Sequence, residues 1–190
     1  MKKIILTVAA VFALSFANAQ DKKEGSAGFA KGNLYLTGAF NFSNTKAGDV
    51  KTDGLSVAPG IGYFLTDNVA LVGALEIGSS KDAADVKTST LGLHAGVKYF
   101  WTPASQFSLS IGGELAYDTD KTGDVKNNTI GLSVPVGLHY FVSDSFAITS
   151  TWGGLNYSSS KDDIAGAEAT TKLGLGIDMT AISFGLIYKL

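Results

Sequence analysis

Residues 60–77 read GIGYFLTDNVALVGALEI, and this stretch decides the fold of the chain. Apolar side chains occupy alternate positions on both sides of a short polar turn at residues 66–68. Alternation with a period of two is typical of β-strands with one apolar face, and a short polar turn between two such runs indicates an antiparallel hairpin. The stretch therefore predicts one β-hairpin.

The Gly-x-x-Tyr-Phe motif that precedes this turn recurs along the chain. Copies begin at Gly60, Gly96 and Gly137, and a shortened fourth copy runs from Gly185 to Tyr188. Longer charged stretches separate the repeats, and we expect them to be loops: residues 46–51, 81–87, 121–126 and 158–170. A repeated supersecondary unit is a strong indication of architecture. Four hairpin units predict an all-β fold of eight antiparallel strands in an up-and-down meander.

The two faces of these strands favour a transmembrane barrel over a soluble one. One face carries large apolar and aromatic residues, whereas the other is mostly Gly, Ala, Ser and Thr, which are too small to form a normal charged surface. Strands of about ten residues match the length that a tilted strand needs to cross a bilayer. Small inward residues suit a narrow closed barrel. A soluble lipocalin-like protein or β-sandwich, with the apolar stripe in its core, is the alternative.

Aromatic residues are expected at both ends of the strands. At the short-turn end lie Tyr63, Tyr99, Trp101, Tyr140 and Tyr188. At the long-loop end lie Phe40, Phe42, Tyr117 and Tyr157. Two aromatic belts at opposite rims are typical of proteins that cross a membrane, because amphipathic rings favour the headgroup level.

The N-terminus has the pattern of a secretory signal peptide. Lys2 and Lys3 precede an apolar run at residues 4–16, and an Ala-x-Ala pattern predicts cleavage between Ala19 and Gln20. The apolar run is too short to cross a bilayer as a helix. We therefore expect export across the inner membrane and localisation in the cell outer membrane. The predicted parts are a signal peptide (1–19), a short polar periplasmic lead (20–32) and a barrel domain (33–190).

Composition excludes several classes of protein. The chain has 190 residues, of which 45% are hydrophobic and only 17% charged, so it is not disordered. It has no cysteine, which excludes a disulfide scaffold, a thiolate zinc site and a cysteine nucleophile. The net charge is −2 and every basic residue is lysine, which argues against a nucleic acid partner.

Several polar residues share the face that carries the small side chains, and we expect them to line the lumen. They are Glu76, His94, Lys98, Glu114, His139 and Lys189. Glu76 and Glu114 lie on the strands that flank the strand of His94, so they can form a Glu–His–Glu or a Glu–Lys cluster. We interpret the set as a polar network that plugs the lumen, because buried charges need partners. We assign no catalytic residue, metal or cofactor.

Two local motifs are set aside. Residues 118–124 resemble the start of a calcium loop, but position twelve is Thr129 instead of a bidentate glutamate, so a solvated loop is the preferred interpretation. Residues 158–161 match Ser-x-x-Lys in a polar loop rather than on a helix, and no Gly-x-Ser-x-Gly occurs. We therefore predict that the protein is not an enzyme.

Two places interrupt the alternation. The apolar parity changes across Gly153 and Gly154, which predicts a β-bulge. It changes again near residues 178–181, which predicts a second bulge or a strand break.

Residues 33–190 resemble the small outer-membrane β-barrel family of Gram-negative bacteria, of the OmpA/OmpX-like or opacity-like kind. The resemblance rests on the repeated hairpin motif and on the alternating C-terminal strand at residues 182–190. It implies that the outer-membrane assembly machinery recognises this strand. The family usually ends in Phe, whereas this chain ends in Leu190 with Tyr188 two residues before it.

The expected function is a structural or surface-interaction role through four charged extracellular loops. A narrow porin-like channel for small solutes is the alternative, and a lipid-modifying enzyme that uses His94 or His139 is a third. The expected partners are outer-membrane lipid, the assembly machinery and an unidentified extracellular ligand. We expect a monomer.

Overall fold

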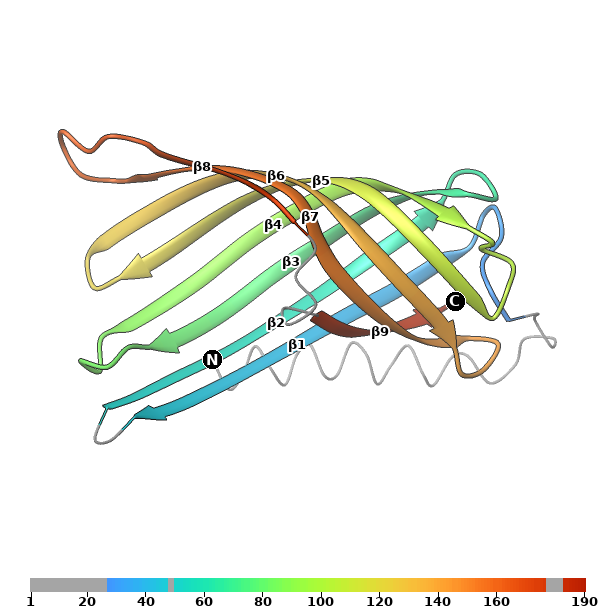
Figure 1. The fold of residues 1–190 in the computed structure, drawn as a ribbon, viewed down its shortest axis with the longest axis horizontal. Coiled ribbons are helices and arrows are strands. Elements are labelled where there is room, and N and C mark those ends of the chain that lie inside the picture. The colour runs from blue at the N-terminus through green and yellow to red at the C-terminus, as the bar shows by residue number, and fades with distance from the viewer. Residues whose placement is uncertain (1–26, 48–49, 177–182) are drawn as a thin grey trace.

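The computed structural model describes residues 27–47, 50–176 and 183–190, and the regular elements in this part of the chain are all β-strands (Figure 1). No helix among the described residues has the length and apolar character that a membrane span requires. The strands are β1 (Leu34–Ala47), β2 (Val50–Phe64), β3 (Val69–Lys81), β4 (Lys87–Trp101), β5 (Phe107–Thr122), β6 (Val125–Phe141), β7 (Phe146–Asp162), β8 (Thr170–Leu175) and β9 (Ser183–Lys189).

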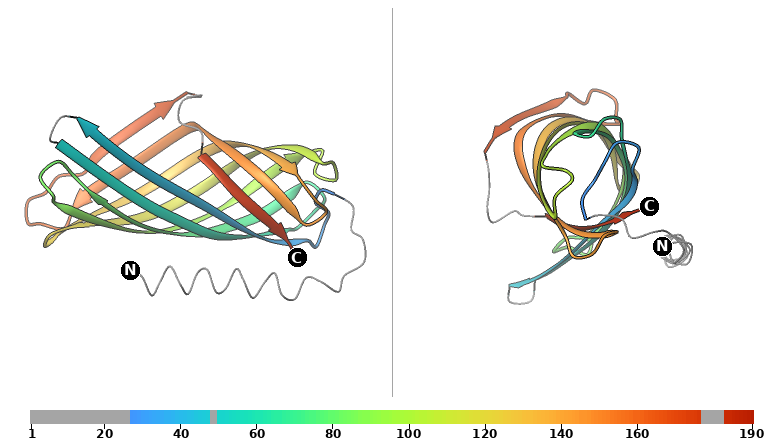
Figure 2. Two further views of the ribbon diagram at one scale, coloured as in Figure 1. Left: turned by 90° about the horizontal axis from the view of Figure 1, so that it is seen from below. Right: turned by 90° about the vertical axis from the view of Figure 1, so that its right-hand side faces the viewer.

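The strands close into a barrel. Each strand from β1 to β7 pairs antiparallel with the next, and β9 pairs with both β7 and β1. The eighth strand is in two pieces, because β8 pairs with the later half of β7 and β9 with its first half. The end view shows the ring of strands, with β8 leaning away from it (Figure 2, right). The predicted eight-stranded antiparallel barrel is confirmed.

The hairpins at the long-loop end extend much further than the sequence indicates. Strands β1 to β7 contain 13 to 17 residues, not about ten. Only residues 123–124 separate β5 from β6, so the loop expected at 121–126 is wrong in its extent. Residues 46–47 and 50–51 also belong to strands, whereas the loop expected at 81–87 is nearly as predicted, at residues 82–86. The loop expected at 158–170 is wrong in its extent, because β7 continues to Asp162 and residues 163–169 form the connection to β8.

Polar cross-strand contacts explain why these extensions remain strands. Thr119 Oγ1 donates to Asn128 Oδ1 across the β5–β6 hairpin at 2.9 Å. The hydroxyls of Thr88 and Thr122 lie 2.7 Å apart across β4 and β5. Such cross-strand pairs stabilise the ends of these strands, where no apolar face is present. Gly123 adopts a positive φ of 59°, which allows the tight turn between β5 and β6.

The bulge predicted at Gly153 and Gly154 is confirmed. Val134 pairs with Leu155 and Val136 pairs with Trp152, so two glycines of β7 face the single residue Pro135 of β6. Proline has no N–H to donate to the ladder, which makes this the natural place for an extra residue. The second irregularity, predicted at residues 178–181, lies outside the described residues.

The large apolar side chains point outward from the barrel. Along β4, for example, Leu91, Leu93 and Val97 are exposed, whereas Gly92 and His94 face inward. The inverse arrangement, with the stripe in a soluble core, is therefore not the one that the chain adopts.

The buried apolar residues gather at the short-turn end of the barrel. The phenylalanine of each complete Gly-x-x-Tyr-Phe motif points inward, and Phe64, Phe100 and Phe141 are each 0% exposed. Phe29 enters from the N-terminal lead and packs against all three rings, with centroid distances of 4.7, 5.4 and 4.8 Å respectively. Tyr35 completes the cluster at 5.2 Å from Phe29. We call these five residues the aromatic plug.

Contacts of the lead with the barrel hold the plug in place. The amide of Phe29 donates to the carbonyl of Pro103 at 2.6 Å. The ammonium of Lys189 donates to the carbonyl of Gly28 at 2.7 Å and lies over the ring of Phe141. Gly28 has a φ of +106°, and a Cβ there would collide with the backbone of Ala104. Only glycine fits this close approach.

Candidate functional site: the polar lumen

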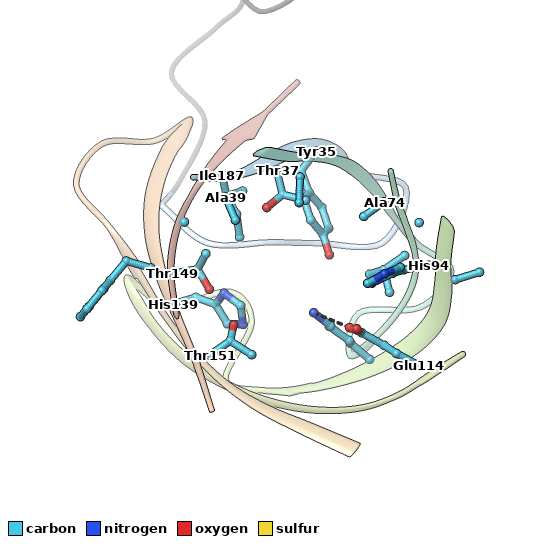
Figure 3. Close-up of a pocket in the computed structure, with 17 residues that line it drawn as sticks. Tyr35, Thr37, Ala39, Ala74, His94, Glu114, His139, Thr149, Thr151 and Ile187 are labelled. Atoms are coloured by element: carbon cyan, nitrogen blue, oxygen red, sulfur yellow. Dashed lines mark ion pairs between the residues drawn. The ribbon is translucent and has the colours of Figure 1, made fainter. Parts of the chain in front are cut away.

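A polar lumen with a cavity of about 160 Å³ lies next to the plug (Figure 3). Lys98 on β4 and Glu114 on the neighbouring strand β5 form an ion pair in its wall, with 2.9 Å between Nζ and Oε1. Both side chains are about four-fifths covered, at 21% and 22% exposure. A partly desolvated pair of this kind ties the two strands together, provided that neither partner is lost.

His94 lies beside two carboxylates from the neighbouring strands. Its Nε2 is 3.0 Å from Oδ1 of Asp118 on β5 and 3.8 Å from Oε2 of Glu76 on β3. The sequence indicated a Glu–His–Glu or a Glu–Lys cluster. Both kinds of contact are present, but Glu114 pairs with Lys98, and Asp118 takes the second acidic position beside His94.

The register explains this division. Glu114 is opposite Gly96, and His94 is opposite Ala116, so Glu114 lies two residues nearer the plug than the His94 row. Lys98 is on the same inward face as Glu114 and reaches it diagonally. Diagonal neighbours on one face of a sheet are within reach of long side chains.

Asp118 is the lumen residue that sequence reasoning missed. The sequence of residues 118–124 resembles the start of a calcium loop and is interpreted as a solvated loop, but β5 continues to Thr122, so Asp118 is a strand residue. The signal that identifies it is parity, since Asp118 shares the inward face with Glu114 and Ala116. The calcium-loop resemblance and the solvated-loop interpretation are both wrong for these strand residues.

His139 packs against the plug and is separate from the charged residues. It lines the same cavity as Lys98, but it is 4% exposed and its ring centroid lies 5.0 Å from that of Phe100. Its Nε2 is 2.8 Å from the hydroxyl of Ser110. Within the described part of the chain, no hydrogen-bond partner reaches its Nδ1.

This Ser–His contact does not have the arrangement of a nucleophilic site. A serine nucleophile needs an orienting group on the far nitrogen of its histidine and a path for substrate. Ser110 is 2% exposed and is not among the residues that line the cavity. The contact instead satisfies two buried polar groups beside the plug.

A second, open cavity of about 190 Å³ lies toward the long hairpins. Hydroxyl and amide side chains line it, among them Asn41, Ser43, Ser56 and Thr90, together with Glu76. We call it the vestibule. Glu76 thus contributes both to the vestibule and to the group around His94.

Four of the five residues expected in the aromatic belt at the short-turn end are half-exposed, and the fifth is buried. Tyr63, Tyr99, Trp101 and Tyr140 are half-exposed on the outer face. Tyr188 lies on the same face as the exposed Phe184 and Leu186, but it is only 8% exposed. At the opposite end Phe40, Phe42, Tyr117 and Tyr157 are exposed.

The N-terminal segment contains a predicted cleavage position and a residue of the plug. The predicted signal cleavage between Ala19 and Gln20 lies outside the described residues. Phe29, in the lead, was missed as a site residue because the segment is otherwise polar. The sequence gives only a weak indication of its role, because Phe29 is a lone aromatic residue in a stretch rich in small and polar residues.

Comparisons with known proteins agree with this architecture. Outer membrane protein OprG from Pseudomonas aeruginosa has a similar structure, with a TM-score of 0.53 and 14% identity over 86% of this chain and 98% of that chain. Neisserial surface protein A (NspA) is similar with a TM-score of 0.53 and 19% identity over 83% of this chain and 97% of that one. At these identities the likeness concerns the fold alone. No curated protein sequence matches the chain.

The family comparison covers nearly the whole sequence. The model of the outer membrane protein beta-barrel domain matches residues 6–189. The family points to the outer membrane as the location of the protein. The chain therefore belongs to the family of outer membrane proteins with a β-barrel domain.

Proposed function

We propose that this protein is a closed outer-membrane barrel with a structural or surface-interaction role, carried out through its projecting hairpins. The aromatic plug is the observation that supports this proposal. Four phenylalanine rings with 1% exposure or less occupy the short-turn end of a narrow barrel. Water and ions have no favourable path through such a dry, close-packed cluster.

A narrow channel for small solutes is the second candidate. The cavity of about 160 Å³ and the vestibule of about 190 Å³ favour it, because both lie in the lumen and carry polar groups. The plug and the Lys98–Glu114 pair argue against an open path from these cavities to the short-turn end.

Conductance in planar bilayers separates the two candidates. The full-length wild-type protein should show no discrete current steps. Phe29→Ala removes the ring that the lead supplies to the plug, so it should produce steps or raise the leak. Phe42→Ala, which truncates an exposed ring at the other end of the barrel, is the matched control and should resemble the wild type. Regular current steps from the wild type would establish the channel instead.

The proposed role requires that the long hairpins face the exterior and that the short turns and both termini face the periplasm. The absence of cysteine from the sequence allows this orientation to be tested with single-cysteine variants. Asp163→Cys lies in the β7–β8 loop, and Ser105→Cys lies in the short β4–β5 turn, and both positions are exposed.

An impermeant maleimide should label Asp163→Cys on intact cells. Ser105→Cys should react only after the outer membrane is opened. The reverse labelling pattern would contradict the proposed orientation and, with it, a surface role for the hairpins.

We further propose that the protein has no enzymatic activity and that its outer face contacts lipid. The buried Ser110–His139 contact, which a substrate cannot reach, supports the first statement. A change in lipid acylation that depends on the protein and is lost in His94→Ala or His139→Ala would establish the lipid-modifying alternative.

A further inference from the structure

We propose that Glu76, His94 and Asp118 form a binding site for one divalent transition-metal ion, such as Zn²⁺. Each residue offers one ligand atom, and these three atoms lie within 4.8 Å of one another. Bonds from Zn²⁺ to nitrogen and oxygen ligands are about 2.0–2.2 Å long, so an ion can lie between the three atoms with only small side-chain shifts. The proposed site goes beyond the surface role and does not depend on it.

The barrel backbone builds this arrangement. Gly92 on β4 is directly opposite Glu76 on one side and Asp118 on the other, so the three positions form a row across three strands. His94 follows two residues later on the same inward face. The site is therefore placed by the sheet register and not by a mobile loop.

Gly92 leaves the space into which the three side chains converge. A Cβ at this position would collide with Oδ1 of Asp118 and would lie 3.1 Å from Nε2 of His94 and 3.2 Å from Cβ of Glu76. The missing side chain thus leaves room for the carboxylate of Asp118 to approach His94 and Glu76 over the centre of the row.

The charges of this group are unbalanced. Two carboxylates flank one imidazole, and within the described part of the chain lysine makes no ion pair with either of them. Lys98 is the lumen lysine nearest to His94 in the sequence, and it forms its ion pair with Glu114. The three side chains are only 25–34% exposed, so water screens the repulsion between the carboxylates incompletely. A bound cation relieves that repulsion.

The vestibule provides an entry path. It is open, polar and about 190 Å³ in volume, and Glu76 forms part of its wall. Three protein ligands leave at least one coordination position for water or for an anionic group that enters through the vestibule.

The donor set favours some metal ions over others. Imidazole nitrogen is a good ligand for zinc and its first-row neighbours, whereas Ca²⁺ requires six to eight oxygen ligands and Mg²⁺ prefers to keep its waters. We therefore expect Zn²⁺ to bind in the presence of millimolar Ca²⁺.

Calorimetric titration of the full-length, metal-free protein in detergent micelles tests the site. Zn²⁺ should bind with a stoichiometry of one. His94→Gln, Asp118→Asn and Glu76→Gln should each weaken binding by about tenfold or more. The double variant Lys98→Met with Glu114→Leu, which removes a lumen ion pair outside the site without a change of net charge, should leave the affinity within about twofold of the wild type. Gly92→Ala should weaken binding while it retains all three ligands.

The two histidines of the sequence allow a second measurement. In NMR spectra of selectively labelled protein, Zn²⁺ should shift the imidazole signal that is missing from His94→Gln and leave the signal of His139 unchanged. A change of electrophoretic mobility on heating in SDS confirms that each variant is a folded barrel. The proposal is overturned if folded wild-type protein does not bind Zn²⁺, or if His94→Gln binds it equally well.

Discussion

Neighbouring residues of the repeated motif have opposite roles because side chains alternate across a strand. In each complete copy the tyrosine faces outward at the belt and the phenylalanine faces inward to the plug, as Tyr99 and Phe100 illustrate. The fourth copy has Lys189 in place of the phenylalanine, and its ammonium binds the carbonyl of Gly28 instead of adding a ring. One motif therefore specifies both the aromatic belt on the outer face and the closed end of the barrel.

Truncation of an inward ring should destabilise the barrel strongly. Phe100→Ala removes a side chain that is fully buried among Phe29, Phe64 and His139, so the free energy of unfolding should fall by about 3–5 kcal/mol. Urea titration in detergent, followed by tryptophan fluorescence, measures this change. Phe42→Ala at an exposed position should cause a clearly smaller loss, and equal losses would show that the plug contributes nothing specific.

The Lys98–Glu114 pair allows a prediction about burial of charge. Lys98→Met leaves Glu114 in a largely covered lumen without its counter-ion, which should reduce stability by about 3 kcal/mol. The double variant Lys98→Met with Glu114→Leu removes both charges and should recover most of the loss. The same urea titration tests the pair. A double variant that is no more stable than Lys98→Met would show that the unpaired carboxylate is not the cause of the loss.

At the scale of single elements, hairpin length and the β6–β7 bulge are set by contacts between strands. Polar pairs extend β5 and β6 as far as residues 122 and 125, although these ends have no apolar face. In β7 the two consecutive glycines allow the chain to pass Pro135 with one extra residue. Interactions across strands therefore decide where an element bends or ends.

Substitution of Gly154 in the bulge should destabilise the barrel. A Cβ at Gly154 would lie 2.5 Å from the carbonyl oxygen of Val134, so Gly154→Ala requires the backbone of β6 or β7 to move. We expect a loss of about 1–3 kcal/mol. Gly174→Ala in the adjacent strand β8 meets nothing within 4 Å and is the matched control. Both variants can be compared by the temperature at which the SDS-resistant form is lost, and equal temperatures would contradict the role given to Gly154.

At the scale of the whole molecule, closure depends on β9 and not on β8. Strand β9 pairs with β1 and β7 and so completes the ring, whereas the pairing of β8 in the described residues is with β7 alone. In the bilayer every backbone polar group of the ring needs a partner, so the closing strand is under the stronger constraint.

Proline substitutions should separate these two strands. Proline at Leu186 removes a donor from the closing strand, so Leu186→Pro should abolish the mobility difference between unheated and boiled samples on SDS gels. Leu173→Pro in β8 should retain this difference, as should the wild type. An unheated Leu186→Pro sample that still migrates as a folded barrel would show that the ring closes without this strand.

The sequence alone determined the number of strands that cross the barrel, the division of the strands into an apolar and a small-residue face, and the bulge at Gly153 and Gly154. These follow from alternation and from the hairpin repeat, which are local properties of the chain. It also placed Glu76, His94, Lys98 and Glu114 on the inward face, since parity needs no knowledge of neighbouring strands.

Only the tertiary structure decided which inward residues meet. The partner of His94 is Asp118 and not Glu114, because β4 and β5 pair in a register that places Asp118 opposite Gly92 and Glu114 opposite Gly96. This register continues through residues 118–122 of β5, a stretch that looks like a loop in the sequence. Phe29 joins the plug through contacts with residues far along the chain, which no local pattern encodes. The faces of the strands are therefore set locally, whereas the plug and the group around His94 arise from closure of the barrel.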